Sequence, residues 1–138
     1  MKLTLSVKSD YFKGLLVLSR RDRVIDDRER NFLIRVGEIL DFDRRFCETA
    51  IDELLSNAHI TRDPIVFSDE DIKECFFRDA LRVAFSDGSV HPTEIRWLRK
   101  TAHANGKSGE WLDAIIQEYT EARGMQNLWA PLEIQKHT

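Results

Sequence analysis

The chain is poor in the residues that interrupt or cross-link a fold. Among its 138 residues there are only three prolines, six glycines and two cysteines. Cys47 and Cys75 lie far apart and form no CxxC motif, which argues against a disulfide framework and against a cysteine-based zinc site. We therefore expect two buried free thiols in a reducing compartment.

The sequence also lacks long apolar runs and an excess of one charge. No stretch approaches the roughly 20 apolar residues of a membrane span, and the N-terminal segment has no hydrophobic region typical of a signal peptide. Its 21 basic and 24 acidic residues give a net charge of −3, whereas dedicated nucleic-acid binders are usually strongly basic. We expect one cytoplasmic domain over residues 1–138, with protein partners, no nucleic acid and no transmembrane segment. Peripheral membrane association and the oligomeric state stay open.

Apolar residues recur at helical spacing along most of the chain, and no long period-two alternation indicates a strand. The pattern predicts an all-α helical bundle with helices at about 8–21, 27–40, 43–57, 69–86, 92–105 and 109–123. Expected helix signals are N-caps at Asp43 and Ser108, a capping box over 68–71, Pro92 in a first turn, and C-terminal glycines at Gly106 and Gly124.

The two halves of the chain resemble each other at an offset of 65 positions. Eight identities occur without a gap, and they fall on core positions and helix starts: Lys8/Lys73, Phe12/Phe77, Leu16/Leu81, Asp22/Asp87, Glu29/Glu94, Leu33/Leu98, Ile51/Ile116 and Glu53/Glu118. We expect two three-helix units, about 8–57 and 73–122, related by a pseudo-two-fold axis. A linker over 58–67 would join them, and 124–138 would form a C-terminal tail.

The turn after the first helix of each unit has the same acidic pattern. In each turn an Asp is followed seven positions later by a Glu, as Asp22 by Glu29 and Asp87 by Glu94. A Glu at the third position of a helix can accept from the N-cap amide, and its charge suits the helix N-terminus. Helix capping is therefore our preferred interpretation of both turns.

A divalent metal ion is the alternative interpretation, and the one candidate cofactor. An EF-hand fails, because its first ligand positions would fall on Leu18, Arg20, Val83 and Phe85, which offer no carboxylate or other side-chain oxygen. A weaker site remains if the pseudo-two-fold axis brings the turns together. Its candidate ligands are Asp22, Asp26 and Glu29 with Asp87, His91 and Glu94.

The segment AFSDGSV followed by HPTEIRWLRKTAHANG resembles the TerB-like domain, a family named for a tellurite-resistance protein. The matching positions are Asp87, Gly88, Val90, Pro92, Glu94, Leu98 and Gly106, with a weaker copy at Asp22, Ile25, Glu29, Leu33 and Leu40. His91 replaces the usual small cap, and Arg23 stands where a Gly could be. The resemblance implies an all-α bundle, a bacterial stress-linked role, and metal or partner ligands at Asp22, Glu29, Asp87 and Glu94, with His91 as a local addition.

Signals for catalysis are weak. His59, His103 and His137 stand alone, and no nucleophile motif or glycine-rich phosphate loop occurs. We therefore expect a binding or sensing module and no enzyme; a metal-dependent enzyme built on the acidic turns is the competing class. The apolar tail 127–134 is expected to pack back over the bundle.

Overall fold

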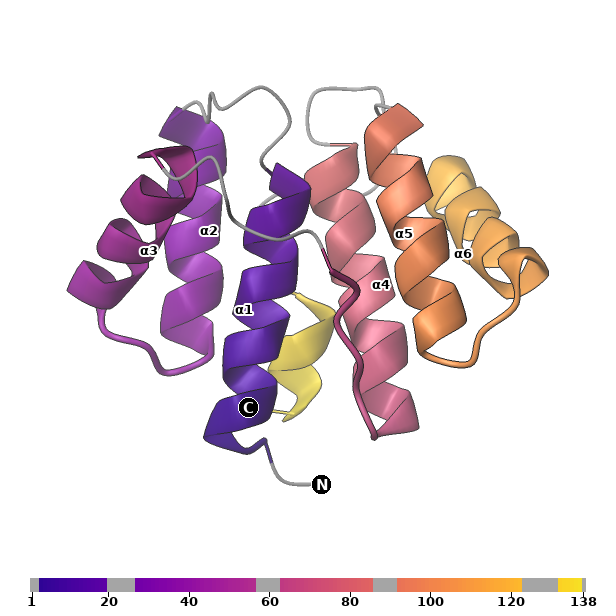
Figure 1. Ribbon diagram of the computed structural model, residues 1–138, viewed down its shortest axis with the longest axis horizontal. Coiled ribbons are helices and arrows are strands. Elements are labelled where there is room, and N and C mark those ends of the chain that lie inside the picture. Colours follow the sequence, from indigo (N-terminus) through magenta and orange to yellow (C-terminus); the bar gives the residue numbers. More distant parts are fainter. Residues whose placement is uncertain (1–2, 20–26, 57–62, 86–91, 123–131, 138) are drawn as a thin grey trace.

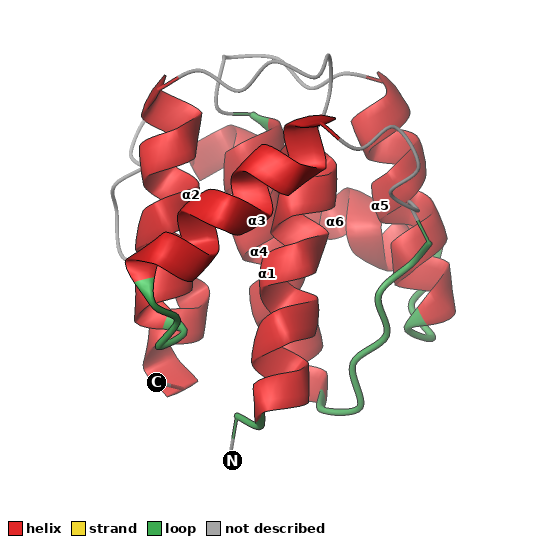
Figure 2. Ribbon diagram, turned by 60° about the vertical axis from the view of Figure 1, so that its left-hand side comes forward, coloured by secondary structure: helices red, strands yellow, loops and turns green. Residues whose placement is uncertain are grey.

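Six α-helices and a short 3-10 helix make up the regular structure of the described residues, which are 3–19, 27–56, 63–85, 92–122 and 132–137 of a computed structural model (Figure 1). Figure 2 shows helices and loops but no strand in this part of the chain. The elements are α1 (Leu5–Ser19), α2 (Asp27–Ile39), α3 (Arg44–Ser56), α4 (Glu70–Ala84), α5 (Pro92–Ala104), α6 (Gly109–Ala122) and η2 (Glu133–His137). The predicted all-α class is confirmed for these residues.

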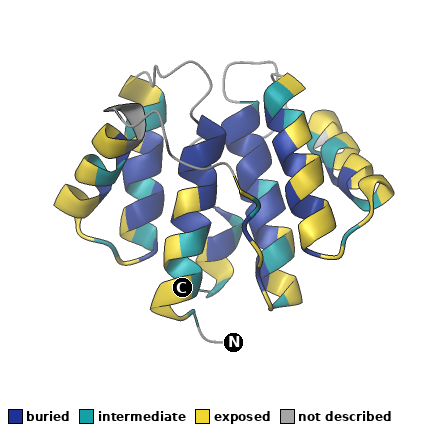
Figure 3. Ribbon diagram, viewed as in Figure 1, coloured by how far each residue is buried: buried dark blue, intermediate teal, exposed yellow. Residues whose placement is uncertain are grey.

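The helices are arranged around a central pair. α1 and α4 pack against each other and run in the same direction, with α2 and α3 beside α1, and α5 and α6 beside α4 (Figure 1). Figure 3 shows buried positions on nearly all sides of the upper parts of α1 and α4, whereas the outer helices are buried on one side only. This difference follows from their positions, because a central helix contacts protein all round.

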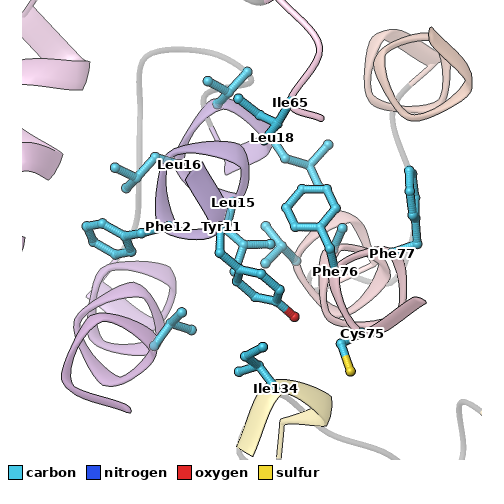
Figure 4. Packing of buried hydrophobic residues seen from close by; sticks show 14 of the residues in the cluster. Tyr11, Phe12, Leu15, Leu16, Leu18, Ile65, Cys75, Phe76, Phe77 and Ile134 are labelled. Atoms are coloured by element: carbon cyan, nitrogen blue, oxygen red, sulfur yellow. The ribbon is translucent and has the colours of Figure 1, made fainter. Parts of the chain in front are cut away.

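The contact between α1 and α4 depends on one glycine and two aromatic rings. A Cβ atom on Gly14 would lie 2.6 Å from Cζ of Phe76, so only a glycine lets that ring approach the α1 backbone so closely. The ring of Phe76 packs edge to face against Tyr11, with centroids 5.3 Å apart. In Figure 4 the two rings point to opposite sides of the helix pair, Phe76 toward Ile65 and Tyr11 toward Ile134.

A short segment covers each of these two sides. On the first side, Ile65 and Phe67 are buried although their segment belongs to the predicted linker. The side chain of Asn105, the residue directly after α5, holds this segment, donating to the carbonyl of Ile65 at 2.7 Å and accepting from the amide of Phe67 at 2.8 Å. On the second side, η2 packs against α4.

The helix bounds repeat at the offset seen in the sequence. Shifting α1 by 65 positions gives the bounds of α4, and shifting α2 gives those of α5. α3 shifted in the same way begins where α6 begins and ends one residue before it.

The turn after the second helix of each half repeats as well. Asp41 and Gly106 both have left-handed backbones, with φ of 71° and 75°. The amide of Phe42 donates to the carbonyl five residues earlier at 2.8 Å, and the amide of Lys107 does the same at 2.9 Å. This bond pattern is the Schellman motif, and the expected C-terminal role of Gly106 is confirmed.

The structure corrects two local predictions. The N-cap of α4 is Asp69, whose carboxylate accepts from the amides of Asp71 and Ile72. The predicted capping box placed the N-cap at Ser68, one residue too early. Phe46 shares the helical spacing of apolar residues with Cys47 and Ile51, a pattern that predicts a core position, but it is 52% exposed. It lies in the first turn of α3, outside the line of core positions, and stacks on Phe42 instead.

Other local predictions are confirmed. Asp43 caps α3 by accepting from the amide of Arg45, and Ser108 caps α6 by accepting from the amide of Trp111. Pro92 is the first residue of α5. Both cysteines are free and buried.

Candidate functional site

The acidic helix starts predicted as a site lie at one end of the bundle. α1 and α4 end there, and α2 and α5 begin there (Figure 1). Glu29 is the third residue of α2 and Glu94 the third residue of α5, as predicted. Glu94 is buried, with 6% of its surface exposed, and Glu29 is half-buried. Asp27 adds a further exposed carboxylate to the first turn of α2.

The other four candidate ligands, Asp22, Asp26, Asp87 and His91, lie outside the described residues. Within the described ranges, no group of three or more His, Cys, Asp or Glu side chains could hold a metal ion. The hypothesis of a shared metal ion at the two turns therefore stays a prediction.

A substitution at both glutamates separates capping from metal binding. Under the capping interpretation, Glu29→Gln and Glu94→Gln should each cost no more than about 1 kcal/mol, because Gln can also close a capping box. The melting temperature of the wild type should then be unchanged by millimolar Ca²⁺, Mg²⁺, Mn²⁺ or Zn²⁺. A metal-dependent rise that the double substitution abolishes would instead establish an ion site, since a ligand of the folded state stabilises it. Thermal melts with chelator and with each ion measure the difference.

A second polar cluster, the Asp79 centre, was not predicted. It consists of Tyr11, Asp79 and the amides of Glu133 and Ile134. Asp79 is fully buried on α4, and its carboxylate accepts from the Tyr11 hydroxyl at 2.6 Å and from the two amides at 2.8 and 3.2 Å. The centre therefore joins α1, α4 and η2.

Burial dominates the electrostatics of this cluster. It raises the pKa of the Asp79 carboxyl, although the three hydrogen bonds and the charge of Arg82 act in the opposite direction. Burial, followed by the nearby charge of Asp79, holds the pKa of Tyr11 well above its ordinary value. The same two causes raise the pKa of the Cys75 thiol to about 11, so this thiol is protonated at neutral pH and is a poor nucleophile. The chemistry of the cluster is that of a hydrogen-bond acceptor for backbone amides.

One sequence signal could have revealed this centre. Asp79 lies on the core-facing side of α4, among Phe76, Ala80 and Val83, where a carboxylate must find donors because burying it without them is costly. The donors are the Tyr11 hydroxyl and two backbone amides distant in sequence, which no local pattern identifies. The predicted packing of the tail is confirmed at Leu132 and Ile134, which are 2% and 0% exposed.

The surface of the described residues adds no further candidate. Arg44 forms ion pairs with Glu38 and Glu48, which are typical of a solvated surface. None of the described helices is long and apolar enough to cross a bilayer. Comparisons with protein-family models, curated protein sequences and solved structures find no match to this chain.

Proposed function

We propose that the chain is a non-enzymatic helical binding or sensing module, similar to TerB, that contacts its protein partners at the acidic inter-helix turns. The observation that carries the proposal is the placement of two acidic helix starts at one end of the bundle. The resemblance to TerB would associate such a module with tellurite resistance or another stress response in the cytoplasm.

Two equivalent three-helix units are part of this proposal. The repeated helix bounds and Schellman motifs support them. The contacts between the central helices support them too. At the 65-position offset, Tyr11 corresponds to Phe76 and Gly14 corresponds to Asp79. Tyr11 of α1 contacts Asp79 of α4, and Phe76 of α4 lies against Gly14 of α1. A pseudo-two-fold axis between α1 and α4 accounts for this exchange of roles, and it would place the two acidic turns side by side.

The charge at these helix starts defines the partner that they fit. Asp27 and Glu29 lie in the first turn of α2, and Glu94 lies in the first turn of α5. Because Glu94 is buried, the charge that would face a partner is the acidic pair Asp27 and Glu29, which lies beside Arg28 and Arg30 of the same turn. A partner surface carrying Lys or Arg complements it, with an on-rate that falls as salt rises.

An NMR titration with an Arg- and Lys-rich peptide tests the proposal. The amides of residues 27–31 and 92–96 should shift most, and Glu29→Gln with Glu94→Gln should weaken binding at least fivefold. Glu110→Gln is the matched control, because Glu110 also lies in a first turn but at the start of α6, at the opposite end of the bundle. Shifts spread evenly over the surface, or an equal effect of Glu110→Gln, would contradict the proposal.

A further inference from the structure

The side of the α1–α4 pair that faces η2 has the features of a receptor for a short peptide. Its polar part is the Asp79 carboxylate, which accepts from two successive amides at the start of η2. Its apolar part encloses Leu132 and Ile134, whereas Gln135 and Lys136 are exposed. Figure 4 shows Ile134 directed toward Tyr11.

This surface recognises the backbone and two aliphatic side chains. A carboxylate that accepts from two backbone amides does not select for any side chain on those residues. Selectivity for the peptide sequence therefore comes from the sites that enclose the side chains of Leu132 and Ile134. The segment closes its own first turn, because the amide of Leu132 donates to Oε1 of Gln135 at 2.7 Å. The pattern that fits is therefore aliphatic-x-aliphatic-Gln in a single helical turn.

The surface of the α1–α4 pair that η2 covers, called the groove from here on, supports the helical shape of η2. A helix of five residues is not stable alone in water, because helix nucleation is unfavourable. Beyond Asp79, the contacts of η2 with the bundle include a 3.7 Å bond from the Cys75 thiol to the Glu133 carbonyl and a 3.5 Å bond from Arg35 to Gln135. The Arg35 bond is long for an N–H···O hydrogen bond, and a thiol is a weak donor.

The two segments that cover the α1–α4 pair differ in how they are held. Residues 63–69 run between α3 and α4, so they cannot leave without moving helices at both ends. η2 follows α6 and leads into no other described helix. Its removal would therefore break no connection between two of the described α-helices.

We propose that the groove under η2 is a peptide-docking site, which the chain's own residues 132–137 occupy as a tethered ligand. A partner presenting an aliphatic-x-aliphatic-Gln turn would bind there by displacing this segment. Because η2 belongs to the same chain, its docking is intramolecular and has a high effective concentration, so a competing peptide binds measurably only when the internal segment is weakened or the partner contributes further contacts. This site is separate from the acidic turns and does not rest on the function proposed for them.

The full-length chain carrying Ile134→Asp provides the test, because the substitution places a charge where the native side chain is fully buried and leaves the groove residues unchanged. The probe is a fluorescent acetylated peptide of residues 132–137, followed by anisotropy. The variant should bind this peptide at least tenfold more tightly than the wild type does. The same peptide carrying Ile134→Asp should bind at least tenfold more weakly to the variant, and so should the native peptide when Asp79→Asn is added to the variant.

Absence of binding by a variant that circular dichroism shows to be folded would overturn the proposal, as would equal binding of the two peptides. If the variant does not fold, hydrogen exchange of the wild type decides. The amides of Glu133 and Ile134 should then exchange at least tenfold faster than those of Phe76 to Ala80 in α4. Equal protection would show that η2 opens only when the whole fold does, and would also overturn the proposal.

Discussion

Replacing Phe76 with alanine should lower the free energy of unfolding by about 3–5 kcal/mol, because the change removes a large buried side chain that its neighbours cannot replace. Phe76 is fully buried, and its ring contacts those of Tyr11, Phe67 and Trp97. It also fills the space that Gly14 leaves open on α1. Urea unfolding of the wild type and the variant measures the loss, provided that the unfolding free energy depends equally steeply on urea concentration in both proteins.

Phe46→Ala is the matched control, since it makes the same chemical change at an exposed position. Phe46 is 52% exposed and its ring stacks on Phe42, so its replacement should cost less than about 1 kcal/mol. Equal losses at the two positions would show that the α1–α4 contact is not the centre of the core.

Replacing Asp79 with alanine should cost about 3 kcal/mol, because the Tyr11 hydroxyl and the amides of Glu133 and Ile134 all lose their acceptor. A buried donor left without a partner costs about 1–3 kcal/mol, and detachment of η2 would relieve part of that cost. Tyr11→Phe removes one donor and keeps the ring, so it should cost only about 1 kcal/mol. A loss from Asp79→Ala no larger than that from Tyr11→Phe would contradict the proposed role of the carboxylate.

The effect of Asp79→Ala should also depend on pH. Burial raises the pKa of Asp79 in the folded chain above its ordinary value of 3.8, so the folded state binds a proton more readily than the unfolded state does. The stability that Asp79 contributes is then fully present below about pH 4 and declines as the pH rises through the folded-state pKa. In urea titrations, the difference in unfolding free energy between wild type and variant should become smaller as the pH rises through the folded-state pKa of Asp79. A difference that grows with pH would contradict the prediction.

The helices could be predicted because their signals are local. The apolar periodicity predicted the six α-helices, and the caps at Asp43 and Ser108 followed from residue type and position. Phe32 and Trp97, which occupy equivalent positions at the 65-residue offset, are both buried. The exposure of Phe46 was missed because periodicity identifies the apolar side of a helix but does not fix where burial ends.

The remaining features depend on contacts between distant parts of the chain. Ile65 and Phe67 are held in the core by Asn105, just after α5, which binds their backbone, and Asp79 accepts hydrogen bonds from residues in α1 and η2. For the acidic site, local spacing correctly placed Glu29 and Glu94 at the third helix position. Whether the turns meet depends on the relation between the two halves, which spacing alone does not determine.

An experimental structure that includes residues 20–26 and 86–91 tests the two-unit arrangement most directly. Superposing residues 8–57 on 73–122 should align three helices in each half by a rotation near 180°, with Asp22 over Asp87 and the two acidic turns side by side. A different crossing angle between the helices of the two halves, or acidic turns that lie apart, would contradict both the pseudo-two-fold arrangement and the binding surface inferred from it.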